Sequence, residues 1–381
     1  MKKYRIGEVT ENLDNLRKPL NSIQRSSISK KKLYPYYGAN NLIDYVDEYI
    51  FDEEILCVAE DGGSWGYKEK CTYIVNEKCW VNNHAHVLRA KDNLNIAYLS
   101  YYLNYNDLNS HITGTTRGKL TKSALSNIEI LLPELEKQNI IVEILDKAQE
   151  LIDRRKEQIA MLDELVKSQF IEMFGDKDKY TYIKIEQLVS NKSDIVDGPF
   201  GSNLKTVDYV DDGVRVIQIN NIGESNFRDK NKKYITEEKY KSLLKHSVVP
   251  GDIVVAKMGE PIGRACILPD YISKAVIVAD CMKIRPNLAI INRKYLEFLL
   301  NTEEVKAQFR KYSQGSTRVR LNLTMLRQIK VLYPPIELQN QFADFVKQVD
   351  KLKFEMEKSL KELEDNFNSL MQKAFKGELF N

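Results

Sequence analysis

Hydrophobic side chains recur in two long stretches of the chain with alternating steps of four and three residues. The first stretch runs from Ile141 to Met173, and the second runs from Phe342 to Ala374, each position lying 201 residues after its counterpart. This spacing is typical of the a/d seam of a coiled coil. It predicts two helices, within 134–176 and 335–381, each roughly 50 Å long at about 1.5 Å per residue.

A helix with one apolar seam needs a partner, and the simplest partner is the other helix of the same chain. Because a globular segment separates the two stretches, parallel and antiparallel pairings are both open from the sequence. Antiparallel packing would relate the two halves by an approximate two-fold axis. The alternative is that each seam pairs with a second copy of the chain. Arg155 and Lys353 interrupt the seams, which suits a polar partner or a device that fixes the register.

The chain also repeats itself. Residues 114–139 and 315–340 align without gaps and share Gly, Thr, Arg, Leu, Ile, Pro, Glu, Gln and Asn at corresponding positions, a variety that low complexity does not explain. A fainter repeat relates 55–66 to 252–263. A fixed internal period indicates a duplicated architecture, with one globular segment before each helix. The predicted domains are 1–133, 134–176, 177–334 and 335–381.

Each globular segment has the pattern of a mixed α/β domain. Apolar runs rich in β-branched residues at 54–59 and 252–256 lead into glycine turns, and a second run follows each of them, which predicts a twisted sheet. Helical patterns follow at 96–103 and 293–300. The predicted fold class is therefore α+β: a tandem repeat of two mixed α/β domains separated by two long antiparallel coiled-coil helices.

Composition adds little to this picture, but the distribution of charge adds more. The 381 residues are 43% hydrophobic, enough for a core in each domain, and 57 basic against 54 acidic side chains leave a net charge of only +3. Segment 177–334 has 27 basic and 18 acidic side chains, whereas segment 134–176 has 6 and 11. Positive charge on the globular parts, kept off the helices, is expected if the globular parts face phosphates.

Cysteine use and hydropathy suggest where the protein resides. The five cysteines show no paired spacing, which favours reduced thiols over a secreted disulfide scaffold. No stretch approaches the roughly 18 apolar residues of a membrane span. We therefore expect a soluble, cytoplasmic protein with no membrane partner.

Candidate catalytic motifs fail on their spacing. The segment Gly114–Thr121 superficially resembles a phosphate-binding P-loop, but it lacks Ser or Thr after Lys119. The Pro-Pro pair at 334–335 lies at a helix start and does not match an adenine methyltransferase motif. Pro269-Asp270 is not followed by a nuclease Glu-x-Lys triplet on a strand. The sequence predicts no catalytic constellation.

A histidine pair raises the question of a metal. In Asn82-x-His84-x-His86 the three polar side chains are expected on one face of a strand. Two histidines could begin a zinc site with Cys71 or Cys79, but no further ligand motif completes it. We predict no metal site, and a hydrogen-bonding role is favoured.

Short motifs in a duplicated order resemble those of the DNA specificity (S) subunit of Type I restriction–modification systems. In the first half they are YPYYGAN at 34–40, WVNNHAHV at 80–87, and LP at 132–133 followed by EKQ at 136–138. In the second half they are DGPFGS at 197–202, VPGDI at 249–253 and PPIELQ at 334–339. The resemblance covers essentially the whole chain.

This resemblance implies two target-recognition domains, each reading one half of a bipartite, asymmetric site in double-stranded DNA. The helices would separate the two domains and dock modification (methyltransferase) subunits, with restriction subunits joining the complex. S-adenosylmethionine for adenine-N6 methylation, ATP and Mg²⁺ would sit on those partners, and this chain would hold no cofactor and be no enzyme. Half-sites lie about 34 Å apart, which a helix pair of roughly 50 Å can span.

Residue chemistry suggests which side chains face DNA, since amide and basic groups suit base edges. The base-reading candidates are Asn40, Asn41, Ser64, Trp65, His84 and His86 in the first domain, and Ser202, Asn203, Lys205, Gln218, Asn220, Lys257 and Arg264 in the second. The phosphate candidates are Lys30, Lys31, Lys32, Thr116, Arg117, Lys119, Thr317, Arg318 and Arg320. Two other classes stay open: a coiled-coil protein-interaction scaffold that reads no DNA, and a self-contained enzyme.

Overall fold

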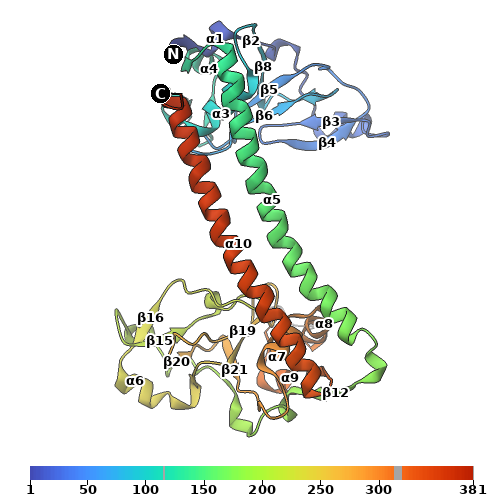
Figure 1. Cartoon of the computed structure of the whole chain (residues 1–381), viewed down its shortest axis with the longest axis vertical. Coiled ribbons are helices and arrows are strands. Elements are labelled where there is room, and N and C mark those ends of the chain that lie inside the picture. Colours follow the sequence, from blue (N-terminus) through green and yellow to red (C-terminus); the bar gives the residue numbers. More distant parts are fainter. Residues whose placement is uncertain (115, 313–319, 381) are drawn as a thin grey trace. The chain divides into compact units, whose positions relative to one another are not determined.

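The computed structural model describes residues 1–114, 116–312 and 320–380. The chain divides into two compact units, of which unit 1 comprises Met1–Ile159 with Met356–Asn381, and unit 2 comprises Ala160–Glu355. The two long helices are α5 (Leu135–Phe174) and α10 (Ile336–Lys376). Each unit therefore consists of one globular part together with a portion of both long helices (Figure 1).

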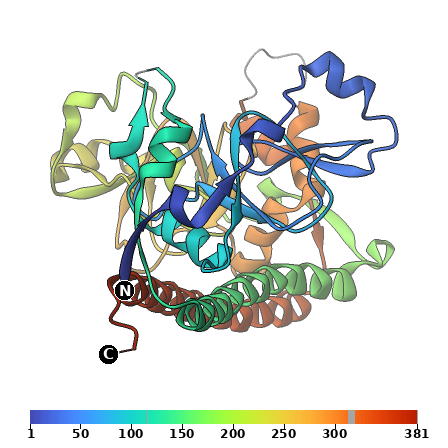
Figure 2. The same cartoon turned by 90° about the horizontal axis from the view of Figure 1, so that it is seen from above.

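The long helices pair with each other and run antiparallel. In unit 1, Lys156 Nζ of α5 lies 3.1 Å from Glu364 Oε1 of α10, and in unit 2 Lys353 Nζ lies 2.6 Å from Asp163 Oδ1. The residue numbers rise along α5 as they fall along α10, which defines the direction. In both views α5 (green) and α10 (red) lie side by side within each unit (Figures 1 and 2). The predicted pairing within one chain is confirmed, as is a polar partner for Lys353.

The predicted seams are the most buried stripes of both helices. In α5, Ile141 and Leu145 are fully buried and Ile152 is 3% exposed; in α10, Phe342 is fully buried and Val346 is 4% exposed. Burial of such side chains, at about 25 cal/mol per Å² of apolar surface, holds the pair together. Arg155, the other seam interruption, donates from Nε to Oε1 of Gln158 on its own helix, at 3.1 Å.

Unit 1 is built on a four-stranded antiparallel sheet in the order β2-β8-β5-β6, on which α3 packs. A second, three-stranded sheet has the order β4-β3-β7, and β1 pairs with β11. The elements are β1 (Lys2–Arg5), α1 (Ile6–Val9), β2 (Thr10–Asn12), α2 (Ser22–Ser27), β3 (Tyr34–Tyr37), β4 (Leu42–Val46), β5 (Ile55–Ala59), β6 (Thr72–Val75), β7 (Trp80–Val81), β8 (Ala85–Ala90), α3 (Ile96–Tyr105), β9 (Ile112–Thr113), β10 (Lys119–Leu120), α4 (Lys122–Asn127) and β11 (Glu129–Leu132).

Unit 2 repeats this frame and enlarges it. Its four-stranded sheet has the order β13-β21-β18-β19, and a five-stranded sheet has the order β14-β16-β15-β20-β17, while β12 pairs with β22. The elements are β12 (Thr181–Lys184), β13 (Ile195–Asp197), β14 (Tyr209–Val210), β15 (Val214–Ile217), β16 (Lys233–Ile235), α6 (Glu237–Ser242), β17 (Ser247–Val248), β18 (Ile253–Ala256), β19 (Ala265–Ile267), β20 (Ala275–Ile277), β21 (Cys281–Ile284), α7 (Arg293–Asn301), α8 (Glu303–Tyr312), α9 (Leu323–Gln328) and β22 (Lys330–Tyr333).

The central strands explain the fainter of the two sequence repeats. In unit 1, Ala59 at the end of β5 pairs with Ala85 at the start of β8; in unit 2, Ala256 at the end of β18 pairs with Cys281 at the start of β21. The glycine-containing turns that the sequence aligned follow these two strand ends. The predicted strand runs and the two shorter helices are confirmed to within a few residues.

A buried glutamine fastens the start of each long helix to its globular part. Gln138 is fully buried; its Oε1 accepts the amide of Asn95 at 2.8 Å, and its Nε2 donates to the carbonyls of Asn93 and Pro133 at 2.9 Å. Gln339 repeats the arrangement in unit 2, with the amide of Asn292 at 2.9 Å. Buried polar groups of this kind are costly when left unpaired, so the side-chain bonds of each glutamine fix where its helix begins.

We expect Gln138→Ala to lower the free energy of unfolding by about 1–3 kcal/mol, because three backbone groups around it would lose their partner. Urea unfolding followed by circular dichroism measures this. The matched control is Gln158→Ala, an exposed glutamine on the same helix, which should cost about 0.5 kcal/mol or less. Equal losses in the two variants would contradict the fastening role of Gln138.

Candidate nucleic-acid interface

In unit 1, the turn after β5 gathers polar side chains from three distant segments, at residues 40, 84 and 117–119. Asp61 Oδ1 accepts from Arg117 Nη2 at 2.6 Å and lies 2.9 Å from His84 Nδ1. Asn40 Nδ2 donates to the carbonyl of Gly62 at 3.2 Å. We call Asn40, Asp61, Gly62, His84, Arg117 and Lys119 reading surface 1. The structure thus brings together residues that the sequence had only suggested separately.

The basic side chains Arg117 and Lys119 of reading surface 1 are accessible, and so is the His84 imidazole. The side chains of Arg117 and Lys119 are 64% and 49% exposed, and that of His84 is 41% exposed. Lys119 Nζ lies 3.0 Å from Glu60 Oε1. Gly62 adopts a φ of +66°, and a Cβ atom there would lie 3.2 Å from the Arg117 guanidinium. The positive φ favours glycine at this turn, and the missing Cβ lets the Arg117 guanidinium approach the backbone closely.

A buried network of ion pairs and hydrogen bonds supports the turn that follows β5. Arg17, whose side chain is 12% exposed, donates from Nη1 to Glu60 Oε2 at 2.7 Å and to the carbonyl of Ala85 at 2.6 Å. Its Nη2 lies 3.3 Å from Asp14 Oδ2. His86 is 1% exposed, with Nδ1 2.6 Å from Asp14 Oδ2 and Nε2 2.7 Å from the carbonyl of Leu120. The network therefore ties β8 and β10 to the turn that presents reading surface 1.

Asp14, Glu60 and His86 are close enough to share a cation. The Arg17 guanidinium supplies positive charge to both carboxylates. Because Arg17 already supplies positive charge to these carboxylates, we interpret the cluster as structural support and not as a metal site.

The same network predicts acid sensitivity. Burial by itself raises the pKa of the Asp14 carboxyl, but bonds from His86 and the Val87 amide outweigh it and leave that pKa below its ordinary value. For Glu60, likewise, bonds from Arg17 and Lys119 outweigh burial and lower the pKa. A carboxyl whose pKa is lowered by folding stabilises the fold above its unfolded pKa and loses that contribution as the pH falls through its folded pKa.

We therefore expect the free energy of unfolding of unit 1 to fall as the pH drops below about 4, where unfolded Asp and Glu begin to bind protons. Urea unfolding between pH 7 and pH 3 measures the effect. The variant Asp14→Asn should show a shallower dependence on pH. A dependence as steep as that of the wild type would mean that other carboxyls cause it.

One predicted geometry is wrong. Asn82, His84 and His86 do not share one face of a strand, because residues 82–84 form a turn and β8 begins at Ala85. Asn82 Oδ1 accepts the amide of His84 at 2.8 Å and bends the chain there. The turn places His84 on the accessible surface, whereas His86 is enclosed.

Two base-reading candidates of unit 1 lie in supporting positions. The imidazole of His86 uses both nitrogens inside the network described above. Trp65 is 6% exposed and donates from Nε1 to the carbonyl of Ala59 at 3.2 Å, which closes the turn. Ser64 and Asn41 are exposed. The geometry thus favours Asn40, Asn41, Ser64 and His84 as the groups available to a ligand.

In unit 2, ion pairs gather at the equivalent ends of β18 and β21. Lys257, 8% exposed, has its Nζ 2.7 Å from Asp197 Oδ2. Arg320, whose side chain is 47% exposed, has its Nη2 2.7 Å from Asp280 Oδ1. We call Asp197, Lys257, Asp280 and Arg320 reading surface 2.

The backbone frame of the two surfaces is the same. The amide of Leu120 donates to the carbonyl of Glu60 at 2.8 Å, and the amide of Leu321 donates to that of Lys257 at 2.8 Å. The amide of Glu60 in turn bonds the carbonyl of His84 at 2.9 Å, and that of Lys257 bonds the carbonyl of Asp280 at 2.8 Å. In each unit, backbone hydrogen bonds thus join three segments at one residue, which is Glu60 in unit 1 and Lys257 in unit 2, and we call this arrangement the three-way junction. The junction is repeated, but its side chains differ, and the charge is reversed from Glu60 to Lys257.

The remaining candidates of unit 2 differ in how far their side chains are engaged by the fold. Arg264 donates to the carbonyls of Ile222, Ile219 and Pro261, so that its guanidinium is engaged by backbone. Gln218 donates from Nε2 to the carbonyl of Asn231 at 3.2 Å. Exposed side chains are those of Ser202, Asn203, Lys205 and Asn220.

The phosphate candidates are more scattered. The amides of Lys30, Lys31 and Lys32 all donate to the carboxylate of Asp47, at 2.7–3.0 Å, which forms an exposed basic turn apart from the contacts of reading surface 1. Thr116 is exposed beside Arg117. Thr317 and Arg318 lie outside the described residues.

Sequence reasoning missed the acidic members of both surfaces. Asp61, Asp197 and Asp280 have contacts with residues 23 to 60 positions away in the chain. No periodic pattern or short motif marks such pairs. Only the alignment of the two halves offered a signal, because it placed the Glu60 and Lys257 turns at one position.

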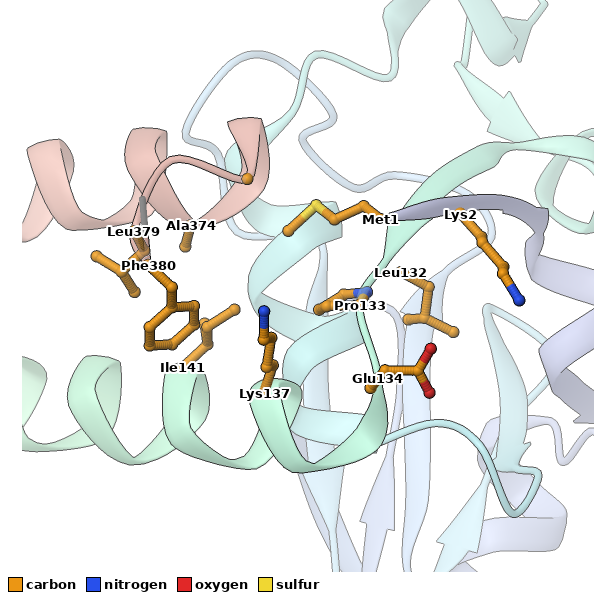
Figure 3. A pocket seen from close by; sticks show the side chains of 11 residues that line it. Met1, Lys2, Leu132, Pro133, Glu134, Lys137, Ile141, Ala374, Leu379 and Phe380 are labelled. Atoms are coloured by element: carbon orange, nitrogen blue, oxygen red, sulfur yellow. The ribbon is translucent and has the colours of Figure 1, made fainter.

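A cavity of about 370 Å³ in unit 1 offers a different kind of chemistry. It lies where α5 begins and α10 ends, and Figure 3 shows Ile141, Ala374, Leu379 and Phe380 on one side and Glu134 and Lys137 on the other. Lys137 Nζ lies 5.8 Å from the centre of the Phe380 ring. The lining carries no nucleophile paired with a base, so we interpret the cavity as a gap in the packing of the chain ends.

Among the helices in the described ranges, none is long and apolar enough to span a membrane.

Comparison with known proteins gives the family. A family model described as "Type I restriction modification DNA specificity domain" matches residues 1–163 and 173–365. The specificity subunit of the type I restriction enzyme MjaVIII from Methanocaldococcus jannaschii is 24% identical over 373 residues, which cover 91% of this chain and 86% of that protein.

Two further likenesses differ in extent. A relative from Haemophilus influenzae, named as a type I restriction enzyme specificity subunit, is 39% identical over 141 residues, and the alignment spans 37% of this chain and 35% of that protein's length. The crystal structure of a Type-I restriction-modification system S subunit from M. genitalium has a TM-score of 0.60 at 14% identity, covering 98% of this chain and 96% of that chain. The second likeness concerns the fold alone.

Proposed function

The chain belongs to the DNA specificity family of Type I restriction–modification systems, as a non-catalytic specificity subunit, and from this premise we propose that it reads a bipartite, asymmetric site in double-stranded DNA. Unit 1 would read one half of the site through reading surface 1, and unit 2 would read the other half through reading surface 2. The observation that carries this proposal is the repeated three-way junction with different side chains on it. One backbone frame used twice with different polar groups suits two dissimilar half-sites.

The contacts suggest a division of labour at each surface. Arg117 and Lys119, exposed and cationic, suit phosphate oxygens, whereas Asn40 and His84 suit base edges. In unit 2 we propose Arg320 of reading surface 2 for phosphate contact, and the exposed polar side chains Ser202, Asn203, Lys205 and Asn220, which lie outside the four residues of that surface, for base contact. We assign Trp65, His86 and Arg264 to positioning, since each holds a turn through buried or backbone bonds. In this proposal the recognition domains are 1–133 and 177–334, with spacer helices 134–176 and 335–381.

The long helices are proposed to dock modification subunits, with restriction subunits joining the complex. Their outer faces carry apolar side chains that the helix pair does not cover, among them Leu151 of unit 1 at 53% exposed and Met161 of unit 2 at 58% exposed. Exposed apolar residues of this kind are typical of protein interfaces. S-adenosylmethionine, ATP and Mg²⁺ would be bound by those partners in the cytoplasm.

Mapping methylated adenines in a genome with and without this chain tests the proposal. We expect one bipartite motif to lose methylation when the chain is absent. In binding assays, replacing Arg117 and Lys119 by Gln should weaken binding to every duplex alike and reduce the salt dependence, whereas Asn40→Ala should alter the choice at one base position. Unchanged methylation, together with binding that does not depend on salt, would favour a protein-interaction scaffold without DNA readout.

A further inference from the structure

The arginines assigned to DNA contact are neutralised by carboxylates of the same surfaces. Asp61 Oδ1 lies 2.6 Å from Arg117 Nη2 in unit 1, and Asp280 Oδ1 lies 2.7 Å from Arg320 Nη2 in unit 2. Both arginines are well exposed, at 64% and 47% of their side chains, so these pairs face solvent. A surface that only had to attract phosphate would gain nothing from such carboxylates.

We propose that Asp61 and Asp280 determine specificity by restraining the binding of non-target DNA. Binding to non-target DNA rests almost wholly on the release of counterions as cations neutralise phosphates. A carboxylate next to each arginine cancels its charge and repels the phosphate, so this general attraction is reduced. At a target site, contacts to base edges add binding free energy. That gain offsets the reduced attraction to phosphates, and it is available only at the target site. This inference rests on the proposed function and names the residues that make its readout selective.

The geometry of the two Asp–Arg pairs favours a role in restraining DNA binding over an incidental ion pair on the surface. Asp61 is the more enclosed partner, 17% exposed, and its two oxygens contact His84 Nδ1 at 2.9 and 3.0 Å besides holding Arg117. The Gly62 turn leaves room for the guanidinium to lie against the backbone. In unit 2, Arg320 also reaches the carbonyl of Ala279, beside Asp280, at 3.4 Å. Each arginine thus has a carboxylate beside its guanidinium that cancels its charge.

The two pairs are built from different positions of the repeated frame. Asp61 follows β5, whereas Asp280 precedes β21, and Arg117 and Arg320 are not counterparts in the repeat of 201 residues. The duplication alone therefore does not explain why both surfaces carry a neutralised arginine. The two surfaces share an exposed arginine paired with an aspartate, and a role in restraining non-target binding accounts for this shared pair.

The test uses the full chain and a fluorescently labelled random-sequence duplex, with binding measured between about 50 and 200 mM salt. We expect Asp61→Asn, and separately Asp280→Asn, to raise the affinity for this duplex about three- to tenfold. The slope of log affinity against log salt should also become steeper by about 0.9 for each carboxylate removed. Asparagine keeps an oxygen that the arginine can bond, so the change isolates charge. Methylation mapping with these variants should show additional, weaker sites.

Matched controls separate this effect from a general rise in net charge. Glu143→Gln in unit 1 and Asp176→Asn in unit 2 also remove one exposed, paired carboxylate, but on α5 and just after it. These should change the affinity much less. The double variant Asp61→Asn/Arg117→Gln should gain less over Arg117→Gln alone than Asp61→Asn gains over the wild type, since part of the effect of the carboxylate is exerted through that arginine.

The outcomes distinguish this inference from the function on which it rests. Wild-type chain that fails to bind duplex DNA in a salt-dependent manner overturns the proposed function. Wild-type binding with normal salt dependence, combined with Asp61→Asn and Asp280→Asn indistinguishable from their controls, overturns the inference alone. Weaker binding by the Asp→Asn variants would also overturn it, because the carboxylates would then serve only to orient the arginines.

Discussion

Arg17→Ala is expected to lower the free energy of unfolding by about 3–5 kcal/mol. The substitution would remove the partner that Asp14 and Glu60 share and leave them with His86 and Lys119 alone, and removing one partner from a buried ionic network is strongly destabilising. The side chains of Asp14 and Glu60 are only 8% and 12% exposed, so water cannot replace the guanidinium. Urea unfolding at pH 7 measures the loss.

The matched control for this prediction is Arg154→Ala. Arg154 pairs with Glu150 on the exposed face of α5 at 68% and 58% side-chain exposure, and a pair of that kind is worth a few tenths of a kcal/mol. If the two variants lost the same stability, the network would be an ordinary surface feature. Because Arg17 also holds the Glu60 turn, its loss should disturb reading surface 1 even where the fold survives, and DNA binding at low temperature would report this.

Phe174→Ala is expected to cost about 3–5 kcal/mol, the usual range when a fully buried phenylalanine is truncated in a core. Phe174, in the last turn of α5, has no exposed surface, and its ring centre lies 5.3 Å from that of Tyr295 and 5.8 Å from that of Phe342. Its counterpart 201 residues on is Phe375, near the end of α10, whose ring centre lies 5.5 Å from that of Tyr98 in unit 1. The free energy of unfolding in urea is the quantity to compare.

Ile171→Ala serves as the control, since Ile171 lies three residues earlier on the same helix and is 65% exposed. It should cost well under 1 kcal/mol. Phe174→Ala and Phe375→Ala should be additive in the double variant, because their clusters share no residue. A loss for Phe174→Ala no greater than for Ile171→Ala would show that the helix end is not anchored in unit 2.

The framework of this fold was predictable because its causes are periodic. The four-three spacing from Ile141 onwards requires a buried stripe, and the duplication points to a second helix that can cover it. The strands at 55–59 and 253–256 were recognisable from their apolar runs and the glycine turns after them. The direction of pairing was not fixed by the sequence, since an apolar seam packs in either orientation; contacts such as that of Lys353 with Asp163 decide it.

The candidate interface was predictable by residue type but not by arrangement. The chemistry of Asn40, His84 and Arg117 suggested them; in the structure His84 and Arg117 both contact Asp61, and Asn40 donates to the carbonyl of the next residue, Gly62. His86 was chosen on the same grounds but is enclosed, because a turn at 82–84 interrupts the expected strand alternation. Single-sequence patterns describe local geometry, whereas these contacts depend on loops that close over dozens of residues. The acidic partners were therefore invisible before the fold was known.

The placement of Phe375 has a consequence for biosynthesis. Unit 1 buries this ring with Tyr98 and Leu99, although well over two hundred residues separate them. A chain that emerges from the ribosome N-terminus first therefore exposes part of the apolar surface of its first half until α10 has been translated. Nascent chains stalled before α10 should accordingly be more open to proteolysis in the first half than finished ones, and this subunit would complete its earliest-made part last.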